Sequence, residues 1–118
     1  MNFTEQLVEQ EEFRVVLVLP YSPMVLVERY DETYHLPRIS ILKRRRTAEQ
    51  LSETIRKKWG VRTIVIDLLP KSHELPPCAV VEVRTRNSKF APDGLVPVSV
   101  DDLDERELTM PECLTLRI

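Results

Sequence analysis

The residues with the clearest chemical potential are cations gathered in one stretch of the chain. Residues 38–62 hold nine Lys and Arg side chains and two acids, a formal charge of +7, whereas the remainder carries −9. Residues 43–46 and 56–58 are uninterrupted basic runs. Lys and Arg bind phosphates and carboxylates through charge-assisted hydrogen bonds, so an anionic partner is one explanation. A solvated surface, or a match to acidic surface on this chain or a neighbouring one, is the other.

Other reactive side chains lack the spacing of a catalytic or metal site. His35 and His73 are isolated, for which packing or surface roles are the commoner explanation. Cys78 opens an apolar run and is expected to be a buried small hydrophobe rather than a nucleophile. The chain has only two glycines, so no glycine-rich loop can cradle a phosphate. We therefore expect no cofactor and no metal site.

Charge and composition also limit the partners and the compartment. Residues 43–46 lack interleaved aromatics and the net charge is −2, so nucleic acid is not expected. Two cysteines without a CxxC pattern, and no signal-peptide pattern, predict reduced thiols in the cytoplasm. The longest apolar run, residues 15–19, is too short to span a bilayer. The remaining partners are a phosphate-containing small molecule, an acidic protein surface and a second copy forming a homodimer.

One helix is predicted over residues 47–59. Its apolar side chains fall on one side of a helical wheel: Ala48, Leu51, Ile55 and Trp59. Thr47 and Gln50 have the T-x-x-Q spacing of a capping box, in which each side chain bonds the other's backbone N–H. Gly60 stands where a left-handed residue would end the helix.

Apolar, β-branched runs predict five strands, at residues 14–19, 24–29, 61–69, 78–84 and 95–100. The first two strands, and the third and fourth, are expected to form hairpins, and Pro97 makes the last strand an edge. Residues 34–36 are a short extended piece and residues 39–46 a loop. Residues 1–12 are expected to be a helix or a flexible arm, residues 101–107 one helical turn, and residues 109–118 the start of a terminal helix. The prediction is one α/β (α+β) domain over residues 1–118, a mixed sheet with the 47–59 helix packed on it.

The order of these elements resembles the Nudix fold. His35-Leu36-Pro37 resembles the segment that leads into a Nudix box, and the 47–59 helix followed by Gly60-Val61 resembles the body and end of that box. The family box is G-x5-E-x7-R-E-U-x-E-E-x-G-U, where U is a bulky aliphatic residue. When its last glycine is aligned on Gly60, Ile55 and Val61 also match.

The catalytic positions of the box do not match. Its first glycine falls on Ile39, and its glutamates fall on Arg45, Thr54, Lys57 and Lys58. In the family these glutamates hold Mg²⁺ or Mn²⁺ against a pyrophosphate, and cations in their place would repel the metal. The resemblance therefore implies a Nudix-like domain with an α/β/α sandwich, truncated at the C-terminus, and without metal-dependent hydrolysis.

Two functional interpretations follow from this resemblance. In the first, the domain is a non-catalytic accessory, regulatory or ligand-binding module, as in Nudix-like domains that precede an aminoglycoside-phosphotransferase-like kinase domain. Its candidate anion ligands are Arg44, Arg45, Lys57 and Lys58. In the second, it is a Nudix-type hydrolase of nucleoside diphosphate derivatives that draws metal ligands from outside the box: Glu28, Asp67, Glu82 or the pair Asp101 and Asp102.

Overall fold

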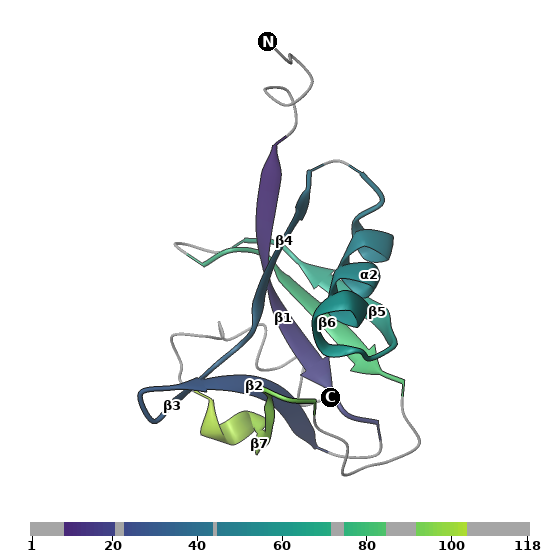
Figure 1. Ribbon diagram of the computed structural model, residues 1–118. Helices are drawn as coiled ribbons and strands as arrows, with labels where there is room; N and C mark the ends of the chain where they lie inside the picture. Colours follow the sequence, from purple (N-terminus) through teal and green to yellow (C-terminus); the bar gives the residue numbers. More distant parts are fainter. Residues whose placement is uncertain (1–8, 21–22, 44, 72–74, 85–91, 104–118) are drawn as a thin grey trace.

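The computed structural model describes residues 9–20, 23–43, 45–71, 75–84 and 92–103. These residues form a mixed sheet of seven strands with one α-helix packed on it (Figure 1). The strands are β1 (Gln10–Val18), β2 (Met24–Tyr30), β3 (Thr33–His35), β4 (Arg38–Leu42), β5 (Thr63–Leu69), β6 (Cys78–Val83) and β7 (Val96–Ser99). The helix is α2 (Thr47–Trp59), and a 3-10 turn, η1 (Val100–Asp102), follows β7. The α+β architecture predicted from the sequence is confirmed.

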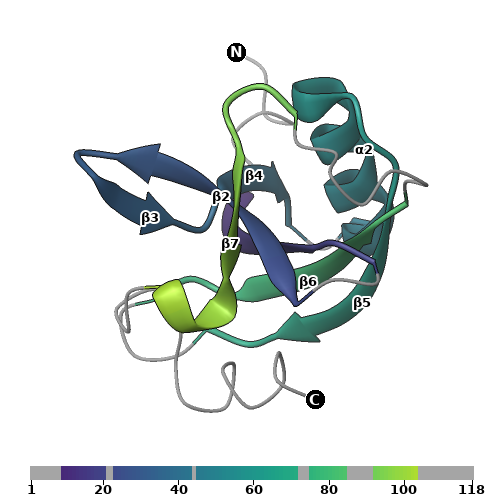
Figure 2. The same cartoon turned by 90° about the horizontal axis from the view of Figure 1, so that it is seen from below.

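Strand β1 is the centre of the sheet. β6 pairs with it in parallel along one edge. Along the other edge, β4 pairs antiparallel with its first half and β2 with its last residues. β3 and β7 both pair with β2, and β5 pairs antiparallel with β6. Within the described part of the chain, β3, β4, β5 and β7 therefore each have a single strand partner, and the edge position that Pro97 predicts for β7 is confirmed (Figure 2).

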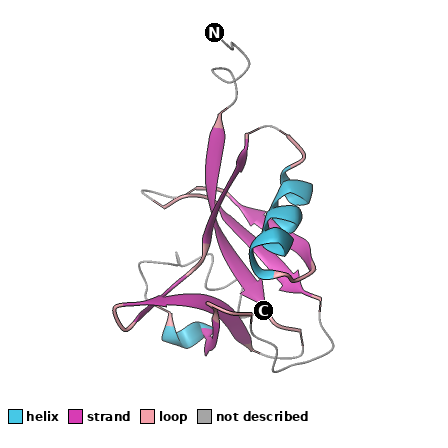
Figure 3. Ribbon diagram, viewed as in Figure 1, coloured by secondary structure: helices cyan, strands magenta, loops and turns pink. Residues whose placement is uncertain are grey.

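The sheet buries apolar side chains on both faces. Val15 and Leu17 of β1 belong to a core cluster that includes Leu51 and Ile55 of α2, and the helix covers this face (Figure 3). Val16 belongs to a second cluster with side chains of β2, β6 and β7. A strand buried on two faces needs apolar residues at every position rather than at alternate ones. This explains the continuous apolar run at the end of β1.

Helix α2 has the predicted bounds, but the predicted capping box is wrong. Arg46 is the N-cap residue, with φ of 27°, and no side chain caps the first turn. Thr47 already lies inside the helix, so its hydroxyl is one residue too late to cap. The carboxamide of Gln50 accepts from the Leu42 N–H at 2.9 Å and donates to the Leu42 carbonyl at 2.9 Å and to the Arg45 carbonyl. It therefore joins the helix to the end of β4 instead.

The other helix predictions are largely confirmed. Gly60 is left-handed at φ 71°, and its N–H donates to the Arg56 carbonyl at 2.8 Å. Leu51 and Ile55 are fully buried, and the half-buried Trp59 packs against their cluster. Ala48 is exposed, against the prediction, and lines a groove beside β5 rather than packing in the core.

The main omission among the strands is β4, which lies in residues predicted as a loop. Ile39 and Ile41 are buried and Ser40 between them is exposed, an alternation typical of a strand. The basic run that follows obscures this pattern. Pairing with β4 also makes β1 begin at Gln10, so residues 10–12 are strand rather than arm. The terminal helix predicted at residues 109–118, and with it any second helical layer, lies outside the described residues, as does most of the turn predicted at residues 101–107.

Two smaller findings complete the fold. Asp31 and Glu32 connect β2 and β3 as a two-residue turn in which both have positive φ, 48° and 66°. Such a turn suits a tight hairpin but strains residues other than glycine, asparagine and aspartate, so the strain falls mainly on Glu32. Among the described helices, none is long and apolar enough to cross a membrane.

Candidate anion-binding site

One cavity lies between the last turn of α2 and the β2–β3 hairpin. It has a volume of about 260 Å³ and is here called the hairpin pocket. Its lining residues are Glu28, Tyr30, His35, Leu36, Arg38 and Lys58. Two of these side chains are permanent cations and one is a carboxylate, so the formal charge of the lining is positive.

The hairpin places its polar side chains through strand register. Glu28 lies directly opposite His35, and Tyr30 directly opposite Thr33, so all four side chains project from one face. The Tyr30 hydroxyl donates to Glu28 Oε2 at 2.5 Å. Thr33 Oγ1 lies 2.6 Å from His35 Nε2, and the Tyr30 and His35 ring centroids are 5.3 Å apart. The two-residue turn therefore fixes a preformed polar surface.

Electrostatics in the hairpin raise the pKa of Tyr30 to about 12. The largest cause is the hydrogen bond that the phenol donates to Glu28, followed by burial and by repulsion from the same carboxylate. The phenol is therefore neutral at physiological pH and occupies an oxygen of Glu28. This hydrogen bond uses one acceptor position of Glu28, whose formal charge is unchanged.

The cations of the pocket differ in their partners. Arg38 Nη1 lies 3.2 Å from Glu12 Oε1, in an exposed ion pair. Lys58 Nζ lies 4.8 Å from the ring centroid of Trp59, which holds the ammonium by a cation–π contact. Among the described side chains, no carboxylate lies within ion-pair distance of Lys58. This ammonium is available to an anion that enters the pocket.

The predicted ligands Arg45, Lys57 and Lys58 do not lie together. Arg45 is exposed before the first turn of α2, and a helix of 13 residues puts it about 20 Å from the last turn. Lys57 points to solvent, with an exposed fraction of 73%, and pairs with Glu53 at 3.7 Å. Lys58 alone lines the hairpin pocket, and Arg44 lies outside the described residues.

Arg38 and Tyr30 are not among the residues predicted for a site, and His35 was predicted to have a packing or surface role. A signal was present, since Glu28 and Tyr30 alternate along one strand before a short polar turn, and His35 follows on the returning strand. Had residues 31–32 been identified as a two-residue hairpin turn, the facing pairs would have followed from register.

The described residues do not fit the divalent metal of the Nudix mechanism. No group of three or more His, Cys, Asp or Glu side chains that could hold a metal ion occurs among them. Of the alternative ligands, Glu28 accepts from Tyr30 and Glu82 pairs with Arg84 at 2.7 Å. Asp67 accepts from the backbone N–H of Leu68 at 2.9 Å, on the far strand β5. These carboxylates do not converge.

Comparison with known proteins identifies the fold and leaves the function open. No protein-family model matches the sequence, and no characterised protein is similar enough in sequence to match it. A solved structure of a provisionally assigned oxidoreductase from Sinorhizobium meliloti 1021 matches with a TM-score of 0.55 and 14% identity, over 91% of this chain and 37% of that chain. A NUDIX hydrolase from Nitrosomonas europaea matches with a TM-score of 0.52 and 10% identity, over 92% of this chain and 69% of that one.

At these identities the likeness concerns the fold alone. This chain spans little more than a third of the length of the first of these proteins. The fold is Nudix-like, as the order of elements predicts.

Proposed function

We propose that the chain is a non-catalytic Nudix-like domain that binds a small phosphate-containing anion in the hairpin pocket. The observation that carries the proposal is the place of Lys58. The resemblance assigns a metal-binding glutamate to this position, and here an ammonium without an ion-pair partner among the described residues lines a cavity. A cation in that place can contact directly the phosphate that a metal would otherwise bridge.

The chemistry of the surrounding side chains supports anion binding. The Arg38 guanidinium has five N–H donors, so it can bind a phosphate in the pocket while one of its nitrogens pairs with Glu12. The one carboxylate of the lining, Glu28, already accepts from Tyr30. Because a pocket with two cations repels Mg²⁺ and attracts phosphate, the same lining that favours binding disfavours metal-assisted hydrolysis.

Binding without turnover suits an accessory or regulatory role. In this proposal the domain reports the presence of its ligand to a larger phosphotransferase-like protein of which it is the N-terminal part. The degenerate box then keeps what folding requires, at Ile55, Gly60 and Val61, while Lys58 serves as an anion ligand at a position where the family box has a metal ligand.

The test is a calorimetric titration of the chain with pyrophosphate and with ADP, in the absence of divalent metal. Lys58→Ala should weaken binding about ten- to a hundred-fold, the value of one charge-assisted hydrogen bond of ~1.5–3 kcal/mol. Lys57→Ala is the matched control, because it removes the same charge from the adjacent position outside the pocket. It should change the Kd by less than about threefold, since only screened long-range charge is lost.

Two results would overturn the proposal. Absence of binding by the unmodified chain would leave the pocket without a ligand of this class, and equal losses in both variants would indicate a diffuse charge effect. The hydrolase interpretation is tested in parallel with Mg²⁺ or Mn²⁺ and nucleoside diphosphate derivatives. Turnover abolished by Glu28→Gln or Glu82→Gln would replace the non-catalytic assignment with metal-dependent hydrolysis.

A further inference from the structure

The β2–β3 hairpin uses its own polar hydrogens internally. The Tyr30 hydroxyl donates to Glu28 Oε2, and the Thr33 hydroxyl donates to the Tyr30 carbonyl at 2.7 Å. A hydroxyl has a single hydrogen, so Thr33 Oγ1 accepts from His35 Nε2, which lies 2.6 Å away. The phenol keeps its hydrogen at physiological pH, because its pKa is raised to about 12. The hydrogens of the two hydroxyl groups and of His35 Nε2 are therefore not available to a ligand.

The hairpin offers hydrogen-bond acceptors to the pocket instead. Glu28 lines the hairpin pocket, and Tyr30 uses only one of its carboxylate oxygens. Among the described residues, no donor lies within hydrogen-bond distance of the other oxygen, Oε1. The donors of the lining come from the facing elements, with Lys58 at the end of α2 and Arg38 at the start of β4. The pocket therefore combines cationic donors with an anionic acceptor.

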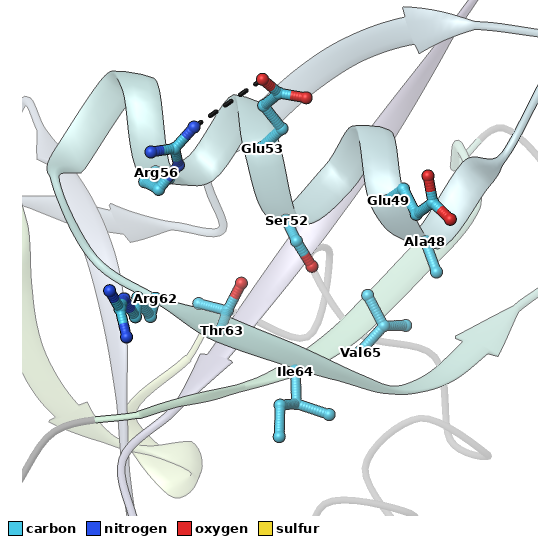
Figure 4. Close-up of a pocket in the computed structure, with 9 residues that line it drawn as sticks. All are labelled: Ala48, Glu49, Ser52, Glu53, Arg56, Arg62, Thr63, Ile64 and Val65. Atoms are coloured by element: carbon cyan, nitrogen blue, oxygen red, sulfur yellow. Dashed lines mark ion pairs between the residues drawn. The ribbon is translucent and has the colours of Figure 1, made fainter.

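The groove beside β5 shows how different this arrangement is. This larger cavity, of about 680 Å³, also has cations and carboxylates in its lining (Figure 4). There Arg56 Nη2 lies 3.7 Å from Glu53 Oε1, so the two opposite charges pair with each other. In the described structure, no such ion pair joins Glu28 to Lys58 or to Arg38. The hairpin pocket thus keeps both signs of charge available to a ligand.

On the basis of the anion binding proposed above, we propose that the hairpin pocket selects a phosphate group that carries its own hydrogen, and that Glu28 determines this selection. The bare oxygens of the anion accept from Lys58 and Arg38, and its P–OH group donates to Glu28 Oε1. An oxyanion without a hydrogen would place a bare oxygen against the carboxylate, where like charges repel and no hydrogen bond forms. Hydrogen phosphate has the required hydrogen, whereas sulfate has none.

The experiment compares tetrahedral dianions that differ in one hydrogen. At about pH 8, inorganic phosphate is mainly the dianion hydrogen phosphate, so its shape and charge match those of sulfate. In calorimetric titrations of the unmodified chain without divalent metal, phosphate should bind at least about tenfold more tightly than sulfate, the value of one charge-assisted hydrogen bond. Fluorophosphate, in which fluorine replaces the hydroxyl group of hydrogen phosphate, should bind as weakly as sulfate.

Glu28→Gln tests the residue itself. The carboxamide oxygen can still accept from Tyr30, and the amide nitrogen supplies a donor where the carboxylate supplied an acceptor. Sulfate should therefore bind more tightly, and the preference for phosphate should fall to less than about threefold. Glu12→Gln is the matched control, because it removes the same charge from the partner of Arg38 outside the pocket lining. It should strengthen the binding of both anions alike and leave the preference unchanged.

The outcomes distinguish this selection from anion binding in general. Equal affinities for phosphate, sulfate and fluorophosphate would overturn the selection and leave the proposed function in place. A preference that Glu28→Gln retains in full would overturn the role of Glu28. Absence of binding by all three anions would count against the proposed function and this selection together. The fluorophosphate comparison uses the unmodified chain, so it tests the selection even where a variant fails to fold.

Discussion

The side chain of Gln50 offers the sharpest test of how α2 is attached to the sheet. Its carboxamide makes two part-buried hydrogen bonds to the peptide groups of Leu42 and one exposed bond to the Arg45 carbonyl. A neutral hydrogen bond contributes a net ~1 kcal/mol, and the exposed bond contributes little, so Gln50→Ala should lower the free energy of unfolding by about 2 kcal/mol. In a domain of this size that corresponds to a fall in Tm of about 8 °C.

Gln50→Glu distinguishes this attachment from a capping box. In a capping box glutamate serves as well as glutamine, so the substitution would be neutral and Thr47→Ala would cost about 1 kcal/mol. In the observed geometry a carboxylate can still accept from the Leu42 N–H, but it faces the carbonyls of Leu42 and Arg45 without a proton. Gln50→Glu should then cost about 2 kcal/mol, and Thr47→Ala almost nothing.

The assay is urea unfolding of Gln50→Ala, Gln50→Glu and Thr47→Ala, followed by the fluorescence of Trp59. The free energies are compared at a common dependence on urea concentration. Lowering the pH below about 4 should restore part of the stability lost in Gln50→Glu, because a protonated carboxyl can again donate to a carbonyl. A stable Gln50→Glu variant together with a destabilised Thr47→Ala variant would refute the attachment and reinstate the box. Glu49→Ala, next to Gln50 and in an exposed ion pair with Arg46, is the control and should change stability by less than ~0.5 kcal/mol.

Four further outcomes are expected. Glu32→Gly should stabilise the chain by about 1 kcal/mol in the same unfolding assay, because glycine adopts the positive φ of the hairpin turn without strain. Gly60→Ala should lower the free energy of unfolding by about 1 kcal/mol. No atom lies within 4 Å of an added Cβ, so the cost comes from the left-handed backbone alone, and a larger loss would indicate a clash. Thr63→Val should be neutral or stabilising by up to ~1 kcal/mol, because the buried Oγ1 has no hydrogen-bond partner in the described structure. A titration followed by ultraviolet absorbance, with Tyr30→Phe as the reference, should give Tyr30 a pKa of about 12, and Glu28→Gln should lower this pKa toward 10. Because the raised pKa favours the neutral phenol in the folded state, its stabilising effect is present below pH 10 and is lost as the pH rises toward 12.

Much of the fold could be predicted because its signals are local. Each apolar run predicted as a strand contains one, and α2 has the predicted bounds, since its periodicity and Gly60 act within a few residues of one another. β4 was missed because its strand pattern spans only five residues and continues into a basic run. The capping box failed because Gln50 bonds to Leu42, eight residues away on a strand, and sequence spacing does not show such a contact.

The candidate site was harder to predict because it depends on register. Lys58 could be selected from its place in the box, but its neighbours come from a hairpin whose pairing is set by a turn of two non-glycine residues. A turn of Asp31 and Glu32 lacks the Asn-Gly signature, so the facing of Glu28 and His35 was not evident. Arg38 enters the pocket from the start of β4, the strand that was not predicted.

The last turn of α2 shows why a cluster of charge in sequence need not be one patch in space. Consecutive helical residues point about 100° apart, so Arg56 and Lys58 project to nearly opposite sides of the helix. Arg56 and Lys57 both pair with Glu53, at 3.7 Å each, whereas Lys58 lines the hairpin pocket. The basic run therefore divides its charge between two surroundings, which means that its effects should be separable by mutation. Lys58→Ala should weaken phosphate binding about ten- to a hundred-fold, the value of one charge-assisted hydrogen bond, whereas Arg56→Ala should change the Kd by less than about threefold. If Arg56→Ala weakened binding as much as Lys58→Ala, the charges of the run would act as one field, and the hairpin pocket would not be a separate site.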